Sequence, residues 1–210
     1  MNIEKLDIQF LKSKTILVTG SSRGIGNAIS EKLLDLGNIV IGTSTKIESL
    51  NNLSNKFQRN FYPMELDLRS PESIRELSDN INKQFESIDV LICNAGVLGD
   101  LSTLDNYNFE VWCDTINVNL NNQLLLIQKV LPNIKKSNKG SIIITSSSVG
   151  QEPRENWGAY SISKHGMEGI STILSKELKK DNIIVNTVNP GGTATSMRKL
   201  AMPDEDQSKI

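Results

Sequence analysis

Short runs of apolar residues alternate along the chain with longer segments whose apolar positions recur at helical spacing. The apolar runs lie at residues 15–19, 38–43, 61–67, 89–94, 141–147 and 182–188. Helical patterns follow the first run as far as Leu36 and cover residues 47–56, 71–85, 109–131 and 159–179. Nearly uninterrupted apolar strands separated by helices are typical of a parallel sheet covered on both faces. The pattern therefore predicts such a sheet, with six strands.

Two local signals refine this prediction. Pro63 lies inside the third run and cannot donate a ladder hydrogen bond, which weakens that strand. Ser70, Pro71 and Glu72 fit the N-cap, the first position and the acidic first turn of the next helix. Right-handed crossovers then give a doubly wound α/β fold of the Rossmann type. No repeat, low-complexity tract or linker divides the chain, so we expect residues 1–210 to form one domain.

Composition narrows the classes of function. The chain has 210 residues, of which 38% are hydrophobic and 22% charged, and its formal net charge is -1. This balance gives no electrostatic reason to expect nucleic acid or an anionic membrane as a partner. No apolar run approaches the roughly 20 residues that span a bilayer, and the first residues lack the apolar core of a signal peptide. Cys93 and Cys113 form no metal-binding spacing, so we expect no metal and a cytoplasmic location.

A glycine-rich turn joins the first strand to the first helix. Its sequence, GSSRGIG, runs from Gly20 through Gly24 to Gly26. Glycines permit a tight turn and close approach of a ligand, and the free amides at a helix start favour a phosphate group. The spacing differs from the usual GxGxxG, and a tight connection without a ligand is the alternative. The position directly after the first strand favours a dinucleotide phosphate site.

The end of the second strand bears on the choice between NAD and NADP. NAD sites place an acid there for the ribose 2′-hydroxyl, and residues 42–46 contain none. Arg23 in the glycine turn and Lys46 after the strand can instead meet a 2′-phosphate. We therefore expect NADP, with NAD as the second candidate; the alternative is that both residues are simply solvated.

Further motifs follow the later strands. They are Asp67, Asn94-Ala95-Gly96, Asn119, Ser147, Tyr160 with Lys164, and Pro190-Gly191 with Thr195. Together with TGSSRGIG, and in this order and spacing, they resemble the short-chain dehydrogenase/reductase family of single-domain Rossmann enzymes. The resemblance runs from about residue 14 to residue 197; a YxxxK motif alone is a weak signal, but the ordered set is a strong one. It implies a dinucleotide-binding catalytic domain that interconverts a carbonyl and a secondary alcohol by hydride transfer.

The Tyr160–Lys164 pair suits this chemistry. An unperturbed phenol has a pKa of about 10, so a tyrosine that acts as an acid and a base at neutral pH needs a stabilised phenolate. Lys164 lies one helical turn after Tyr160 on the same face and places a cation beside it. We expect Tyr160 to be the acid/base and Lys164 to lower its pKa. Without the other motifs, the alternative interpretation is that Tyr160 and Lys164 are ordinary residues on the surface of a helix.

The resemblance implies two further catalytic residues. Ser147 matches the family serine that polarises the substrate carbonyl, and its separation from Tyr160 favours it over Ser146 and Ser148. Asn119 matches the asparagine that holds a water for the proton relay. The structural alternatives are a strand-terminal serine that caps backbone groups and an asparagine that reflects composition alone.

The resemblance also implies the cofactor contacts. Asp67 and Leu68 match the pair that contacts adenine, residues 94–96 match the floor of the site, and Thr193 and Thr195 belong to the segment that holds the nicotinamide amide. The full set is Gly20, Ser22, Arg23, Gly24, Ile25, Gly26, Thr45, Asp67, Leu68, Asn94, Ala95, Gly96, Tyr160, Lys164, Pro190, Gly191, Thr193 and Thr195. Cys93 stands where the family commonly has another asparagine.

The chain departs from the family at its end. It stops at Ile210, before the last helix and the seventh strand that family members typically have. We expect a sheet without that strand, through truncation or in a shortened variant. The helices that pack against a partner subunit in the family are retained, whereas the contact through the seventh strand cannot form. We therefore expect a homodimer rather than a tetramer.

The substrate remains open at this level. The first half of the chain is similar to bacterial 3-oxoacyl-[acyl-carrier-protein] reductases, whose two basic docking positions fall here on Asn138 and Asp181, with Lys135, Lys136 and Lys139 nearby. A different small oxo or hydroxy compound is equally compatible. The alternative from another class is a non-catalytic dinucleotide-binding sensor or scaffold.

Overall fold

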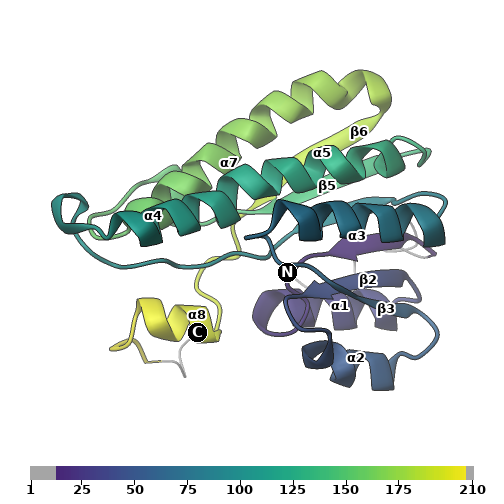
Figure 1. The fold of residues 1–210 in the computed structure, drawn as a ribbon, viewed down its shortest axis with the longest axis horizontal. Coiled ribbons are helices and arrows are strands. Elements are labelled where there is room, and N and C mark those ends of the chain that lie inside the picture. The colour runs from purple at the N-terminus through teal and green to yellow at the C-terminus, as the bar shows by residue number, and fades with distance from the viewer. Residues whose placement is uncertain (1–12, 207–210) are drawn as a thin grey trace, which may run out of the picture.

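The core of the fold is a parallel sheet. The computed structural model describes residues 13–206. Its six-stranded sheet has the order β3-β2-β1-β4-β5-β6, and every neighbouring pair is parallel (Figure 1). The strands are β1 (Thr15–Val18), β2 (Ile39–Ser44), β3 (Phe61–Glu65), β4 (Val90–Cys93), β5 (Gly140–Thr145) and β6 (Ile183–Val188). The predicted six strands and their Rossmann order are confirmed.

Helices cover both faces of the sheet. The principal ones are α1 (Gly24–Asp35), α2 (Asn51–Lys56), α3 (Pro71–Gln84), α4 (Phe109–Ile116), α5 (Asn122–Ile134) and α7 (Gly158–Glu177). Shorter elements are η3 (Ile47–Leu50), η4 (Leu104–Asn106), α6 (Ser148–Gln151), η6 (Leu178–Asp181) and α8 (Ser196–Ala201). In Figure 1, α3, α5 and α7 lie on one side of the sheet and α1 and α2 on the other. None of the helices described is long and apolar enough to cross a membrane.

The alternation of side chains along β1 supplies both layers of the core. Leu17 belongs to a buried cluster with Ile74 of α3 and Leu126 of α5. Its neighbours Ile16 and Val18 belong to the cluster on the opposite face, beneath α1. Full burial of such a side chain contributes about 1.5–3 kcal/mol. The sheet is therefore held between two apolar layers, which fixes the position of its strand ends.

The two edge strands of the sheet differ in their residues and in their exposure. β3 forms one edge, and its Pro63 lies opposite Gly42 of β2. An edge strand tolerates proline because one of its sides has no strand to pair with. β6 forms the other edge, where Ile184 and Val188, which alternate with core residues, are 46% and 49% exposed. That face of β6 is open in the part of the chain described.

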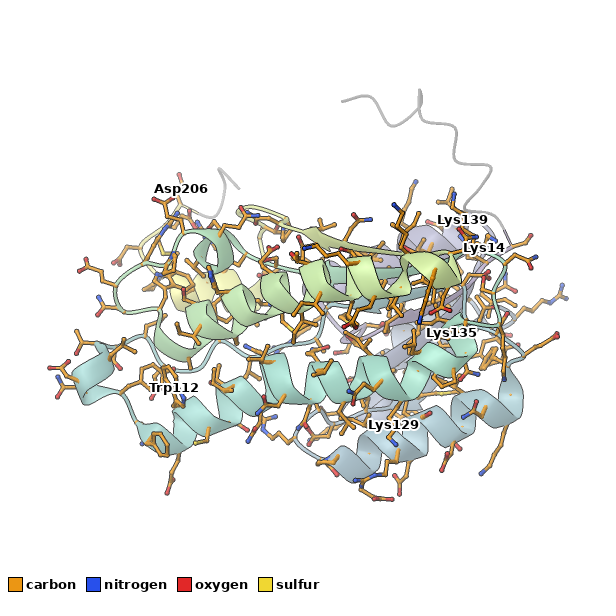
Figure 2. The ribbon with its side chains drawn as sticks, turned by 90° about the horizontal axis from the view of Figure 1, so that it is seen from above. Lys14, Trp112, Lys129, Lys135, Lys139 and Asp206 are labelled. Carbon is orange, nitrogen blue, oxygen red and sulfur yellow. The ribbon has the colours of Figure 1, made fainter. Side chains whose placement is uncertain are left out.

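The segment predicted to be helical over residues 109–131 is helical throughout, but it is not one regular α-helix. A π-helical turn, η5 (Asn117–Asn121), separates α4 from α5, and the N–H of Asn122 bonds to the carbonyl of Asn117. Asparagine side chains compete for backbone groups and so weaken a regular helix. Here the buried side chain of Asn119 bonds to the backbone of Val97. Seen from above, α4 and α5 still form one rod between α3 and α7 (Figure 2).

Candidate active site

A cavity of about 490 Å³ opens at the carboxyl ends of the strands. It lies where the chain order reverses between β1 and β4, which is the expected place for a ligand in a doubly wound sheet. Every predicted cofactor-binding residue except Gly26 lines this cavity, and so does Ser147. The predicted sites, scattered over most of the sequence, thus meet around one hollow. Asn119 does not line it.

The glycine turn forms one wall. Gly20 has a φ of +72°, a conformation that side chains with a Cβ rarely adopt. A Cβ on Gly26 would lie 2.2 Å from the carbonyl oxygen of Gly20, so no other residue fits there. Arg23 is the N-cap of α1 and makes no side-chain cap hydrogen bond. The first amides of α1 therefore face the cavity mouth as a site for an anion.

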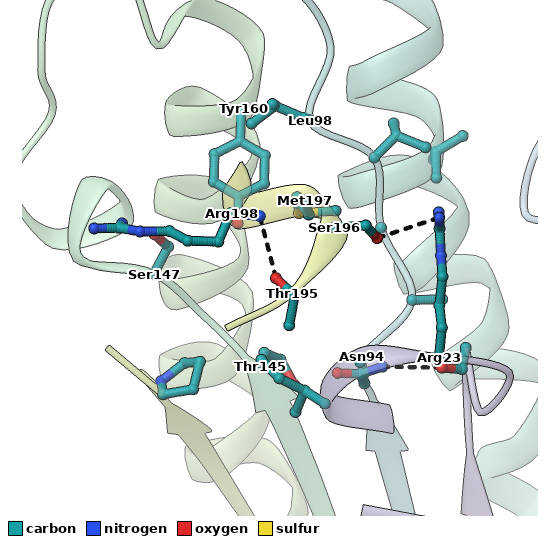
Figure 3. Close-up of a pocket in the computed structure, with 18 of the residues that line it drawn as sticks. Arg23, Asn94, Leu98, Thr145, Ser147, Tyr160, Thr195, Ser196, Met197 and Arg198 are labelled. Carbon is teal, nitrogen blue, oxygen red and sulfur yellow. Dashed lines mark hydrogen bonds between the residues drawn. The ribbon is translucent and has the colours of Figure 1, made fainter. Parts of the chain in front are cut away.

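Thr19 and Asn94 join the ends of β1 and β4. The amides of Asn94 and Ala95 both donate to Oγ1 of Thr19, at 2.9 and 3.0 Å. The side-chain amide of Asn94 donates to the carbonyl of Thr19 at 2.9 Å and to that of Gly20 at 3.5 Å (Figure 3). Asn94 thus braces the floor of the cavity. Thr19, which belongs to the TGSSRGIG motif but not to the predicted site, is its buried anchor.

Ser147, Tyr160 and Lys164 converge on the opposite wall. Helix α7 carries Tyr160 and Lys164, which are 9% and 7% exposed. The Nζ of Lys164 donates to the carbonyl of Thr145 at 2.7 Å and lies 5.7 Å from the centroid of the Tyr160 ring. Ser147, just beyond β5, lines the cavity with Tyr160 and Lys164. A proton donor, a cation and a hydroxyl group therefore share one end of the cavity (Figure 3).

Burial is the main cause of the pKa shifts of Tyr160 and Lys164. It raises the pKa of the Tyr160 phenol above its ordinary 10, and the hydrogen bond with Ser147 opposes that rise. Burial also lowers the pKa of Lys164 to about 8, against a smaller opposing effect of Cys93. The sequence predicted that Lys164 lowers the pKa of Tyr160. In the protein alone the net shift is upward, because desolvation of the phenolate outweighs the stabilisation available to it.

The side chain of Asn119 links the segment after β4 to helix α7, next to Tyr160. Its Oδ1 accepts from the amide of Val97 at 2.8 Å, and its Nδ2 donates to the carbonyl of Val97 at 2.8 Å and to Oγ of Ser163 at 3.2 Å. Ser163 in turn donates to the carbonyl of Tyr160 at 2.7 Å. The side chain of Asn119 is thus engaged in positioning α7 against the segment after β4.

Three basic residues lie near the cofactor end or were expected there, and Lys46 and Arg69 differ from the sequence expectation. Arg23 lines the cavity, and its Nη1 donates to Oγ of Ser196 at 3.3 Å. Lys46 is exposed and lies outside the lining. Arg69, which sequence reasoning missed, lines the cavity but is bound through two nitrogens to Asp114, at 2.8 and 3.0 Å. Arg23 is therefore the cation best placed for a phosphate.

The segment after β6 closes one side of the cavity. Thr195 caps α8 by accepting the amide of Arg198 at 3.1 Å, and a Cβ on Gly24 would lie 3.2 Å from its Cγ2. The guanidinium of Arg198 bonds to both carboxylate oxygens of Glu205, each at 2.6 Å. This segment therefore reaches back to the glycine turn (Figure 3).

A comparison with known families agrees with this geometry. The family model described as short chain dehydrogenase matches residues 14–206. The chain belongs to the short-chain dehydrogenase family. Tyr160, Lys164 and Ser147, to which the sequence resemblance assigned the chemistry, all line this cavity.

Relatives of this short-chain dehydrogenase include proteins with and without a named reaction. It is 36% identical to the uncharacterized oxidoreductase YciK of Escherichia coli, covering 95% of this chain and 81% of that protein. It is 35% identical to the 3-oxoacyl-[acyl-carrier-protein] reductase FabG of Salmonella typhimurium, with the same coverage of 95% and 81%. A Shigella flexneri short chain dehydrogenase solved with NADP superposes with a TM-score of 0.90 at 36% identity, covering 95% of this chain and 85% of that one.

Several cavity residues of this short-chain dehydrogenase were not predicted. The lining also includes Thr43, Ser44, Leu66, Arg69, Val97, Leu98, Val118, Thr145, Ser146, Asn189, Ser196, Met197, Arg198 and Ala201. Most adjoin a predicted residue, so proximity in sequence to a motif was an available signal. Trp157 stacks at a tilt on Tyr160, with ring centroids 5.9 Å apart, and supplies apolar surface beside the reactive phenol. No local pattern marked Arg198.

Proposed function

We propose that this short-chain dehydrogenase interconverts a carbonyl and a secondary alcohol with NADP(H) as the hydride carrier. The observation that supports this best is the convergence of Ser147, Tyr160 and Lys164 in the cavity that the glycine turn also lines. The glycine turn that forms one wall of the cavity is compatible with a bound dinucleotide. It is so tightly folded that a Cβ at Gly26 has no room. NADP is favoured over NAD by Arg23 and by the solved relative with bound NADP.

In the reductive direction the bound cofactor supplies hydride to the carbonyl carbon. Ser147 donates a hydrogen bond to the carbonyl oxygen, and Tyr160 gives that oxygen its proton. The raised pKa of Tyr160 keeps the phenol protonated at neutral pH, as an acid must be. Lys164 offsets the phenolate that is left behind, and the reverse reaction needs the same phenolate as its base. Trp157 and Leu98 flank this end and exclude water.

The remaining predicted residues are proposed in supporting roles. Gly20, Ser22, Gly24 and Ile25 line the phosphate wall, and Gly26 keeps it tight. Arg23 would hold the 2′-phosphate, with Thr45 at the end of β2 beside it. The adenine side is formed by Asp67 and Leu68, the floor by Asn94, Ala95 and Gly96, and the nicotinamide side by Pro190, Gly191, Thr193 and Thr195.

Asn119 is proposed to hold the relay water through its main-chain carbonyl. Its side-chain amide already bonds to Val97 and Ser163, so the side chain serves as a positioning group instead. The π-helical turn that contains it directs the backbone differently from a regular helix, and such turns are frequent at functional sites.

An acyl carrier substrate is not favoured by the surface. Asp181 stands at one of the two docking positions and is paired with Lys135 at 2.8 Å. Asn138, at the other, accepts a bond from Asn182 at 2.8 Å through its carbonyl. Lys135 and Lys139 lie at one end of the molecule (Figure 2). The substrate is therefore proposed to be a small carbonyl compound without a carrier protein.

A homodimer is also part of the proposal. The outer faces of α4 and α7 expose large apolar side chains, Phe109 at 75%, Ile162 at 46% and Ile173 at 56%. A second copy of the chain packed on this face would bury them. Light scattering after gel filtration tests this; a monomer at micromolar concentration would remove the dimer from the proposal without affecting the catalytic site.

The function itself is tested by cofactor titration followed by turnover. NADPH fluorescence should change on binding, with tighter binding than for NADH, and a panel of small ketones and aldehydes should then oxidise NADPH. Binding without turnover of any carbonyl or alcohol would favour the non-catalytic sensor or scaffold. Failure to bind either coenzyme would remove the proposal altogether.

A further inference from the structure

Arg198 lies in the cavity on the side of the reacting groups. The residue sits in the first turn of α8, and its amide is fixed by the cap at Thr195. Its side chain extends toward the side where Ser147 lies, whereas Arg23 stands beside the glycine turn across the cavity (Figure 3). One arginine thus belongs to the cofactor end and the other to the substrate end.

The guanidinium of Arg198 already holds an oxyanion. Its Nε and Nη2 each lie 2.6 Å from one carboxylate oxygen of Glu205, and both side chains are 28% exposed. This two-pronged arrangement is the one by which arginine recognises any carboxylate or phosphate group. Glu205 therefore marks where a free carboxylate would bind.

Three other charged groups of the cavity have partners within the protein. Lys164 bonds to the carbonyl of Thr145, and Arg69 is bound by Asp114 through two nitrogens. Asp67 accepts the amide of Arg69. Arg23 lies at the glycine turn, whereas Arg198 is the lining arginine whose side chain extends toward the side of Ser147 (Figure 3).

We propose that Arg198 binds an oxyanion of the substrate and that Glu205 occupies this place until the substrate exchanges with it. The inference rests on the proposed function and names its substrate class, a carbonyl compound that carries a carboxylate or a phosphate group. Ion pairs that remain partly exposed contribute little to stability, so the exchange costs little. Glu205 follows α8 in a short turn, where its amide bonds to the carbonyl of Met202 at 3.2 Å, so it can swing away while α8 stays capped.

The test compares substrates that differ only in charge. An oxo carboxylic acid, its methyl ester and an oxo phosphate ester of the same chain length are assayed with NADPH. For the wild-type protein kcat/KM should be higher for an anionic compound than for the ester. In Arg198→Met the ratio of anion to ester should fall about tenfold or more, because a charged hydrogen bond is lost. The acid and the phosphate ester, compared directly, identify which oxyanion is used.

Three companion variants separate recognition from structure. Arg198→Lys keeps the positive charge but loses the two-pronged hydrogen bonding of the guanidinium. Its ratio of kcat/KM for anion over ester should lie between those of the wild-type protein and Arg198→Met. Glu205→Gln removes the resident anion and should lower KM for the anionic substrate while leaving the ester unchanged. Lys199→Met removes a positive charge from the same helix outside the cavity lining and should leave the ratio unchanged.

Two kinetic results would overturn the inference. The first is an equal loss for anion and ester in Arg198→Met, because the pair would then only fasten α8. The second is an unchanged ratio in that variant. If the wild-type protein binds NADPH but turns over none of the compounds, calorimetric titration of the oxo acid and the oxo phosphate ester into the protein with NADP decides. No binding of either would overturn the inference, whereas binding that needs Arg198 would support it and place the failure in the proposed reaction.

Discussion

The Nζ of Lys164 lies 2.7 Å from the carbonyl oxygen of Thr145 and 5.7 Å from the centroid of the Tyr160 ring. The lysine is therefore fixed to the end of β5 by the protein itself, beside the residue that it is proposed to assist. A long flexible side chain loses rotamer freedom on burial. Here the side chain of Lys164 loses this freedom when the protein folds, so the cation is in place before substrate binds.

Replacing Tyr160 by Phe should abolish most turnover and leave cofactor binding nearly unchanged. The ring keeps its contact with Trp157, and only the proton donor is lost. A positioned acid contributes about a hundredfold to ten-thousandfold to a rate. Steady-state kinetics and NADPH titration measure the two effects. Tyr62→Phe, in β3 and outside the cavity lining, is the matched control and should retain full activity.

Arg23→Gln should weaken NADPH binding about tenfold or more while sparing NADH, since one charged contact to a phosphate is removed. Lys46→Gln should change neither affinity by much, because Lys46 lies outside the cavity lining. Fluorescence titrations of both variants with both coenzymes measure this. Equal weakening of NADPH and NADH by Arg23→Gln would show that the residue acts on the glycine turn rather than on the 2′-phosphate.

Gly26→Ala should destabilise the protein and weaken cofactor binding. The new Cβ would lie 2.2 Å from the Gly20 carbonyl oxygen, so the turn must move, at a cost of about 1–3 kcal/mol. Gly169→Ala, in the exposed middle of α7 with nothing within 4 Å, should instead gain about 0.5–1 kcal/mol. Urea unfolding of the pair provides the comparison, and similar stabilities of the two variants would refute the steric assignment.

Much of the fold followed from local sequence signals. The strands appear in apolar runs such as residues 15–19 because both faces of a covered parallel sheet are buried. The cap formed by Ser70 and Pro71 is likewise local, and Ser70 accepts the amide of Ser73 as expected. The glycine turn was predictable because its spacing is short and its position after β1 is fixed.

Other features depend on distant contacts and were not predictable. The π-helical turn contains Asn119, whose side chain bonds to Val97, 22 residues earlier in the chain. Arg198 was missed because its position depends on how α8 folds back over the cavity. The direction of the Tyr160 pKa shift depends on burial, which spacing to Lys164 does not reveal.

Asn119→Ala should lower the free energy of unfolding by about 2 kcal/mol or more. The variant leaves the half-buried amide and carbonyl of Val97 without their side-chain partners, and each such group costs about 1 kcal/mol or more. Asn117→Ala, on the exposed side of the same turn, should have a small effect. Chemical denaturation of both variants measures the difference, and comparable losses would mean that the turn itself, not the Val97 contact, is what matters.

Lys164→Met should reveal a pH-dependent contribution of the buried lysine to stability. Burial lowers the pKa of Lys164 from 10.5 to about 8 in the folded protein. Between these values the unfolded chain binds a proton that the folded one does not, so stability rises with pH. Below about 8 both states are charged and the folded protein bears the full cost of burying the cation.

The free energy of unfolding of the wild-type protein should therefore increase relative to that of Lys164→Met as pH rises from about 8 toward 10.5. The slope should be at most about 1.4 kcal/mol per pH unit. Groups that do not interact with Lys164 titrate alike in both proteins and cancel in the difference, whereas Cys93 is coupled to Lys164, so the Cys93→Ala background is used for both proteins. Urea unfolding across this range measures it. A difference that stays constant would show that the bond to the Thr145 carbonyl, rather than desolvation, controls this lysine.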